Sequence, residues 1–301
     1  MGKTKLVVML SSLLYKIIGE GPSSILAHSW FGKIIFRVLS GSVTKFKIFS
    51  TNEGIKVKLN AQEALTLGIV YLGTINKYET RILKAIIKPG DVVIDIGAYV
   101  DGWYTLLAAK LTGNNGHVYA FEPHPIYFQR LKENVQLNQL TNVTLERLGI
   151  FNKNGSSTFY EAQFGSSIIK SQVVAMTKIK PKEITIQTTT LDAYVKAKNI
   201  RHVSLIKIDV EGAEMSVLKG GNRLLRSKNA PDLVVEVFDI QLRRGGSSEA
   251  KLLAYLKSLG YKPYMFTANG LSPYKKEQHS TLNLFFSKRA LALNVCFTDK
   301  D

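Results

Sequence analysis

Two acidic side chains follow neighbouring apolar segments near the middle of the chain, at a spacing that suits a nucleoside ligand. Asp95 and Gly97 come at the end of the apolar run 92–96, and Glu122 follows a second run, 117–121, placed 27 residues after Asp95. A carboxylate in that place can accept hydrogen bonds from both hydroxyls of a ribose. The spacing therefore predicts half of a binding site for a nucleoside cofactor.

The segment between these two acids predicts a glycine turn that opens a helix. Gly97 permits a sharp turn and leaves room for a ligand, because glycine has no Cβ. Gly102 begins the following helix, whose free N–H groups and positive dipole end favour an anion. Asp101, however, would repel a diphosphate, and the turn carries two glycines where an NAD-binding turn carries three. A cationic sulfonium ligand tolerates these acids better, so S-adenosylmethionine is favoured over NAD.

A second acidic group follows a short apolar strand whose one charged residue is Lys207. Asp209, Glu211 and Glu214 come where this strand passes into a helix. Ligands of open parallel sheets bind beyond the carboxyl ends of the strands, so both acidic groups face one crevice if the strands of Asp95 and Asp209 are neighbours. Asp209 and Glu211 are predicted to be catalytic, one of them as the base. Glu214 fits a helix-capping role equally well.

Other residues define the alternatives to this chemistry. Glu236 and His279 are reserve candidates for the base, although a structural role is favoured for both. Asp209, Glu211 and Glu236 carry the hard oxygen ligands that Mg²⁺ takes, so a metal-dependent reaction is an alternative to the metal-free one that we expect. The single cysteine, Cys296, lies outside these motifs and is not expected to be a nucleophile.

The elements that must carry these acids alternate between helix and strand over most of the chain. For 301 residues, we favour one large α/β domain at 61–301 with an N-terminal extension, helical and hairpin-containing, at 1–60. The last two predicted strands, 261–266 and 281–287, are joined by a polar turn around Asn269 that is too short for a crossover helix. They are therefore expected to pair antiparallel at the end of a mostly parallel sheet.

Two smaller features accompany this pattern. The segment 43–59 alternates around Asn52-Glu53-Gly54 and predicts a hairpin. Segments 155–160 and 184–190 predict a pair of strands outside the main sheet. The stretch between them is interpreted either as a mobile substrate loop or as a solvated hairpin. It is rich in lysines, namely Lys170, Lys178, Lys180 and Lys182.

Composition restricts the partners and the compartment. The formal charge of +17 favours an acidic partner such as an anionic membrane face, a nucleic acid or a charged glycan, unless the lysines serve solubility alone. The sequence has no aromatic and basic recognition motif, so no nucleic-acid partner is expected. A single cysteine excludes an internal disulfide and favours a reducing compartment. We therefore expect a cytoplasmic protein, with or without membrane association, and leave its oligomeric state open.

The N-terminal segments 6–18 and 25–39 each predict an amphipathic helix. Neither contains the ~18 consecutive apolar residues that a membrane-spanning helix requires. Packing against the main domain is the favoured interpretation. A helix lying in the interface of an anionic membrane and a contact between two copies of the chain are the alternatives.

Taken together, five blocks of the sequence resemble the FkbM-type class I S-adenosylmethionine-dependent methyltransferases, over about residues 75 to 290. They are VIDIGAYVDGWYTLLAAKL, VYAFEPHP, TTLDAYV, LIKIDVEGAEMSVLKG and LVVEV. The resemblance implies a Rossmann-like sheet of seven strands in the order 3-2-1-4-5-7-6, with strand 7 antiparallel. It also implies methyl transfer to a hydroxyl, often on a sugar or a polyketide-like natural product. We expect the acceptor to be a hydroxyl on a sugar, a glycan or a lipid-linked small molecule.

Carried onto this sequence, the resemblance implies a set of cofactor-binding residues. They are Asp95, Gly97, Ala98, Tyr99, Gly102, Thr105, Glu122, Pro123 and Asp209. The chain departs from the family where Tyr99 replaces a common asparagine and Asp101 stands as an additional residue before Gly102. An NAD-dependent oxidoreductase, and a basic membrane- or nucleic-acid-binding protein with a degenerate cofactor fold, are the alternative functions.

Overall fold

The computed structural model describes most of the main domain and part of the N-terminal extension. The described residues are 46–59, 77–162, 165–168, 170, 180–276 and 282–289. The predicted N-terminal helices, the reserve candidate His279 and the single cysteine, Cys296, lie outside them. None of the described helices is long and apolar enough to cross a membrane.

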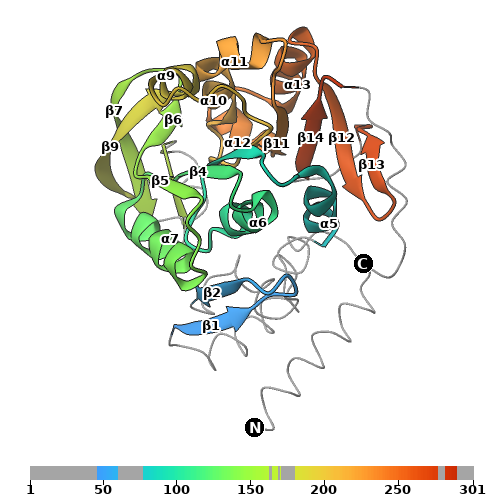
Figure 1. The fold of residues 1–301 in the computed structure, drawn as a ribbon. Coiled ribbons are helices and arrows are strands. Elements are labelled where there is room, and N and C mark those ends of the chain that lie inside the picture. Colours follow the sequence, from blue (N-terminus) through green and yellow to red (C-terminus); the bar gives the residue numbers. More distant parts are fainter. Residues whose placement is uncertain are drawn as a thin grey trace, which may run out of the picture.

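An eight-stranded sheet forms the centre of the domain (Figure 1). Five neighbouring strands pair in parallel, and β14 pairs antiparallel with both β11 and β12. In spatial order the strands are β13 (Gly270–Pro273), β12 (Lys262–Thr267), β14 (Leu282–Ser287), β11 (Asp232–Val237), β10 (Leu205–Ile208), β3 (Val92–Ile96), β4 (His117–Phe121) and β5 (Val143–Glu146).

The sheet differs from the sequence-based expectation at its outer edge. The expected antiparallel pairing of the last two strands is present between β12 and β14. The polar turn expected around Asn269, however, contributes a further strand, β13, which pairs with β12. This strand forms because Leu271 is buried there, although the residues around it are polar. The sheet therefore has eight strands instead of seven.

Helices cover the two faces of the sheet with two separate hydrophobic cores. On one face lie α5 (Lys77–Ile86), α6 (Trp103–Thr112) and α7 (Pro125–Leu137). On the other lie α9 (Leu191–Ala197), α10 (Glu214–Gly220), α11 (Asn222–Arg226), α12 (Asp239–Arg244) and α13 (Glu249–Ser258). Side chains alternate between the faces along each strand, so Val93 and Leu205 join the first core, whereas Ile94 and Ile206 join the second. By the same alternation, Asp95 faces α6.

A second, four-stranded sheet lies beside the β5 edge of the first (Figure 1). Its strands, in spatial order, are β6 (Gly149–Phe151), β9 (Lys182–Thr190), β7 (Gly155–Ala162) and β8 (Gly165–Ser167). The antiparallel pairing of β7 with β9 confirms the predicted pair of strands. Most of the predicted substrate loop between them lies outside the described residues, and its first part forms β8.

The predicted hairpin is confirmed by β1 (Lys47–Ser50) and β2 (Lys56–Leu59), which pair antiparallel below α6 and α7 in Figure 1. Asn134 of α7 joins this hairpin to the domain, since its Oδ1 accepts from the Lys58 N–H at 2.7 Å. Its Nδ2 donates to the Val100 carbonyl at 3.0 Å. The hairpin therefore packs on the helix that also supports the predicted cofactor turn, and the boundary at residue 60 stays a prediction.

Candidate active site

The two predicted acidic groups lie on neighbouring strands, because β3 and β10 pair in parallel. The Asp209 N–H donates to the Ile96 carbonyl at 3.0 Å, so the loops that follow the two strands begin side by side. Gly97 has a φ of +89°, and a Cβ added there would lie 1.8 Å from the Asp209 carbonyl oxygen. Glycine is therefore needed for contact between the two loops. The room expected here for a ligand is filled by backbone.

Asp95 lies within β3, where it is almost fully buried. Its Oδ2 accepts from the Thr105 hydroxyl at 2.6 Å, and its Oδ1 has no hydrogen-bond partner among the described residues. Burial raises the pKa of Asp95 to about 6. Thr105 is itself buried behind Asp95, so its hydroxyl serves to orient this carboxyl group.

Glu122 is also buried, directly after β4. Its two carboxylate oxygens accept backbone N–H groups, one from Tyr99 at 3.1 Å and one from His124 at 2.8 Å. Burial raises the pKa of Glu122 to about 7, against the lowering effect of these two hydrogen bonds. The carboxyl group is therefore held in place by the turn after β3 and by its own loop, in which Pro123 separates Glu122 from His124.

Two residues of the crevice have strained backbone. Four non-glycine residues of the described chain have positive φ, and for two of them, Gln139 and Asn199, the position just after a helix cap explains it. Tyr99 and Glu211, with φ of 56° and 55°, follow strands instead. Such strain persists where function requires a particular loop shape. Asparagine tolerates this conformation better than tyrosine does, which gives a physical reason for the asparagine common at the Tyr99 position of the family.

The amino end of α6 is already occupied by an acidic side chain. Asp101 is buried, and its Oδ1 accepts from the Trp103 N–H at 2.9 Å. Gly102 has a φ of +61°, and an added Cβ would lie 2.3 Å from Leu131 Cδ1 of α7. Gly102 thus permits close packing of α6 on α7, and the anion expected at this helix end is the chain's own carboxylate. A cationic ligand suits this turn better than a diphosphate does.

The second acidic group contains two accessible acids and one capping acid. The Asp209 side chain is 32% exposed, and its Oδ2 lies 3.2 Å from Lys207 Nζ. Glu211 accepts from the Gln241 amide, while its carbonyl accepts from the Ser167 hydroxyl of β8. Glu214 is buried and accepts from the Val210 and Gly212 N–H groups, each at 3.1 Å. It therefore stabilises the turn after β10.

Sequence reasoning named Lys207 and Glu236 but missed the buried polar contacts that they make beneath Asp209. Lys207 is almost fully buried in β10, and it contacts Asn283 of β14 as well as Asp209. Burial raises the pKa of Glu236 at the end of β11 well above its usual value, and the charges of Asp209 and Glu211 add to this effect. The signal that could have found this cluster was the lysine inside an otherwise apolar strand.

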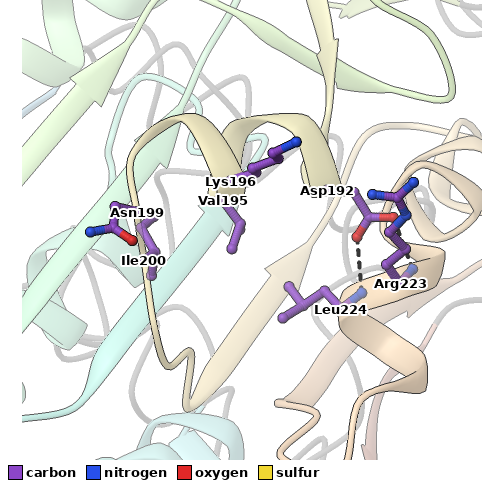
Figure 2. A pocket seen from close by; sticks show the side chains of 7 residues that line it. All are labelled: Asp192, Val195, Lys196, Asn199, Ile200, Arg223 and Leu224. Atoms are coloured by element: carbon purple, nitrogen blue, oxygen red, sulfur yellow. Dashed lines mark hydrogen bonds between the residues drawn. The ribbon is translucent and has the colours of Figure 1, made fainter.

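Two other possible sites fit the chemistry less well. Among the described residues, no group of three or more histidine, cysteine, aspartate or glutamate side chains has an arrangement that could hold a metal ion. A groove of about 340 Å³ lies between α9 and α11 (Figure 2). Its Asp192 accepts from the Arg223 and Leu224 N–H groups, so this acid is used to cap α11. The groove lies toward the amino ends of β10 and β11, away from the crevice.

The residues of the crevice fit S-adenosylmethionine. Asp95 Oδ1 is a buried acceptor without a partner among the described residues, and Glu122 is a buried carboxyl group fixed by two backbone N–H groups. Asp101 and Asp209 add further negative charge around the turn. These carboxyl groups suit a cationic nucleoside, whereas a diphosphate would meet repulsion.

Comparison with known proteins decides the family. Residues 95–263 match the methyltransferase FkbM domain, which is more than half of the chain. The chain belongs to the FkbM methyltransferase family. The resemblance predicted from the sequence is thus confirmed, and the cofactor of this family is S-adenosylmethionine, not NAD.

Individual relatives share limited identity with the chain. The hexuronic acid methyltransferase AglP of Haloferax volcanii is 28% identical over 158 residues, which are 52% of this chain and 60% of the relative. The 2-O-methyltransferase NoeI of Sinorhizobium fredii is 26% identical over 162 residues, which are 50% of this chain and 65% of the relative. The chain thus spans about three fifths of the length of these two relatives.

A solved structure similar to this chain is that of a methyltransferase FkbM from Methylobacillus flagellatus. It has 17% sequence identity and a TM-score of 0.42, with 87% of this chain and 62% of the other covered. The fold assignment therefore relies on the sheet order and on the family match given above.

Proposed function

We propose that the chain transfers the methyl group of S-adenosylmethionine to a hydroxyl of a sugar, a glycan or a lipid-linked small molecule. This proposal rests on one observation. Three acids, Asp95, Glu122 and Asp209, lie at the carboxyl ends of three neighbouring strands of one sheet, β3, β4 and β10. Two family relatives named as a hexuronic acid methyltransferase and a 2-O-methyltransferase support a sugar-type acceptor.

In this proposal the cofactor supplies a methyl group on a positively charged sulfur, which is already a good leaving group. Glu122 accepts the ribose hydroxyls, and Asp95, oriented by Thr105, adds negative charge behind the turn. Ala98, Tyr99 and Pro123, in the loops after β3 and β4, are proposed to contact the same cofactor. The protein's main contribution is to align the acceptor with the methyl group, an effect that reaches ~7–11 kcal/mol in well-oriented systems.

Asp209 is the proposed base, with Glu211 as the second candidate. The acceptor oxygen forms a bond to the methyl carbon while the sulfur–carbon bond breaks, and the hydroxyl proton passes to the carboxylate. Asp209 suits this role because its side chain is partly exposed, and among the described residues only Lys207 contacts it, through Oδ2. Glu211 is held by Gln241, which leaves it less free to approach an acceptor.

A methyl-transfer assay tests the function directly. The chain is incubated with S-adenosylmethionine labelled in the methyl group and with a panel of free hexoses, deoxyhexoses and hexuronic acids, together with glycans and lipid-linked molecules that contain these sugars. The proposal predicts label in at least one sugar, as a methyl ether that raises its mass by 14 daltons. Label in RNA or amines alone, or binding to RNA or anionic vesicles without any methyl transfer, would contradict it and favour another function.

A further inference from the structure

A row of polar side chains crosses four neighbouring strands beneath α5 and α6. In the strand register, Asp95 of β3 lies opposite Lys207 of β10, and Glu236 of β11 lies opposite Asn283 of β14. Along each strand these residues alternate with apolar side chains that face the other core, so all four face α5 and α6. A polar row inside a hydrophobic core is costly unless its members are paired. The contacts of these four side chains therefore indicate which neighbouring residues the row holds in place.

Lys207 is the centre of this row. Its Nζ donates to Asn283 Oδ1 at 2.8 Å and lies 3.2 Å from Asp209 Oδ2. The same ammonium lies over the ring of Tyr104 of α6, 4.8 Å from the ring centroid. These contacts come from three directions, so they fix the position of a side chain that is otherwise among the most flexible.

Asn283 is itself held in one orientation. Its Nδ2 donates to Glu79 Oε2 at 3.0 Å and lies 3.3 Å from the Tyr104 hydroxyl. Its Oδ1 is therefore turned toward Lys207, because the amide carries one acceptor oxygen and one donor nitrogen. Helices α5 and α6 thus support the lysine through a second layer of contacts.

The charges around Lys207 direct it toward Asp209. Burial raises the pKa of Glu79 and of Glu236, and it raises that of Asp95 to about 6. Burial alone would lower the pKa of Lys207, but the carboxylates of Asp209, Glu79 and Glu236 together raise it, so this side chain stays a cation. The carboxylate in direct contact with it is that of Asp209. A buried cation needs such a partner.

We infer that Lys207 is a positioning residue, which holds the Asp209 carboxylate in the orientation that faces the methyl acceptor. This inference rests on the proposed function, because it assigns Asp209 the role of base. The Tyr104 ring and Asn283 keep the ammonium in place on one side. On the other side, the ammonium contacts the partly exposed Asp209 carboxylate.

A double-mutant cycle of Lys207→Met and Asp209→Asn tests this inference. Turnover is measured with the sugar that accepts label fastest in the panel. Lys207→Met alone is expected to lower kcat by ~10–100-fold, because a carboxylate that is no longer held loses alignment. The KM for S-adenosylmethionine should stay within about twofold. In the Asp209→Asn background, the same change should lower kcat by less than about twofold.

Lys288→Met is the matched control. Lys288 is a partly buried lysine whose Nζ lies 5.0 Å from the centroid of the Tyr261 ring and donates to the Leu225 carbonyl, away from the crevice. Its replacement should leave kcat unchanged. Equal losses of kcat from Lys207→Met in the wild-type and the Asp209→Asn backgrounds would overturn the inference, as would an unchanged kcat.

Unfolding in urea, measured for the same four proteins of the cycle, separates this inference from the proposed function. If no sugar accepts label, the proposed function fails, and the unfolding midpoints alone decide whether Lys207 holds Asp209. Non-additive shifts of the midpoint support the contact, and additive shifts overturn it. Lys207→Met should also lower the midpoint more at pH 8 than at pH 5.5, since it leaves Glu79 and Glu236 buried without their cation. An equal shift of the midpoint at both pH values would contradict the claim that Lys207 stabilises the charged forms of Glu79 and Glu236.

Discussion

The proposed site has a cofactor half, around Glu122, and an acceptor half, around Asp209 and Lys207. The two halves are built from contacts between residues with very different separations in the sequence. In the cofactor half, Glu122 accepts from His124 two residues away and from Tyr99 23 residues away. In the acceptor half, Lys207 contacts Asn283 over 76 residues, and Asn283 contacts Glu79 over 204. The first half is therefore shaped by one strand–turn–helix–strand unit. The second depends on the packing of the whole sheet, so changes in the two halves should have separable effects.

Replacement of Asp209 should give the largest difference between the effect on turnover and the effect on cofactor binding. Asp209→Asn should lower kcat by ~10²–10⁴-fold, the range of a lost general base, while the affinity for S-adenosylmethionine changes little. Steady-state kinetics and calorimetry measure the two quantities. Asp192→Asn, at the other end of the sheet, is the control for exchanging a carboxylate for an amide. If Asp209→Asn and Glu211→Gln both keep full turnover, the base is neither residue.

Glu122 should show the opposite pattern, with an effect on cofactor binding. Glu122→Ala removes the acceptor for the ribose hydroxyls, so the affinity for S-adenosylmethionine should fall by ~1.5–3 kcal/mol, as for a hydrogen bond to a charged group. Titration calorimetry measures this loss, and Glu183→Ala, on an exposed part of β9, serves as the control. Unchanged affinity would remove the ribose role of Glu122.

Glu214 tests whether the acceptor half contains a purely structural acid. Glu214→Ala leaves the Val210 and Gly212 N–H groups without their acceptor, and the free energy of unfolding should fall by ~1–3 kcal/mol. Glu214→Gln keeps an acceptor oxygen and should cost less. Urea denaturation compares the two variants. Equal losses of unfolding free energy in the two variants would mean that Glu214 stabilises the fold through its negative charge and not through its hydrogen bonds to the turn.

The pH dependence should be the smallest effect. The pKa of Glu122 in the folded chain, about 7, lies above its ordinary value, as does the pKa of Asp95, about 6. The folded chain therefore binds more protons than the unfolded chain between about pH 4 and 7, and stability falls as pH rises through this window. We expect a loss on the order of 1 kcal/mol per pH unit in urea denaturation without cofactor.

Glu122→Gln provides the control for this pH dependence. This variant has no carboxyl group to deprotonate at position 122, so its stability should vary less between pH 5 and 7.5. A cofactor-free protein that is more stable at pH 7.5 than at pH 5 would contradict the claim that burial disfavours the charged form of these carboxyl groups.

The same difference in sequence separation explains what the sequence alone could predict. The positions of Asp95 and Glu122 after successive strands follow from short motifs, and so does the neighbouring turn. The cap role of Glu214 and the filling of the space beside Gly97 depend on how two loops meet, so they could not be read from spacing. Lys207 stood out as a charge inside an apolar strand, but its partners Asn283 and Glu79 are brought near only by the folded sheet.

In the proposed mechanism, one site at the carboxyl ends of β3, β4 and β10 binds the cofactor and presents the methyl group to Asp209. A crystal structure with S-adenosylhomocysteine, the product left after methyl transfer, tests it most directly. We predict that the ribose hydroxyls lie within hydrogen-bonding distance of Glu122 and that the sulfur faces the Asp209 side of the crevice. A nucleoside bound elsewhere, or a ribose that contacts neither Glu122 nor the turn at Tyr99, would contradict the account.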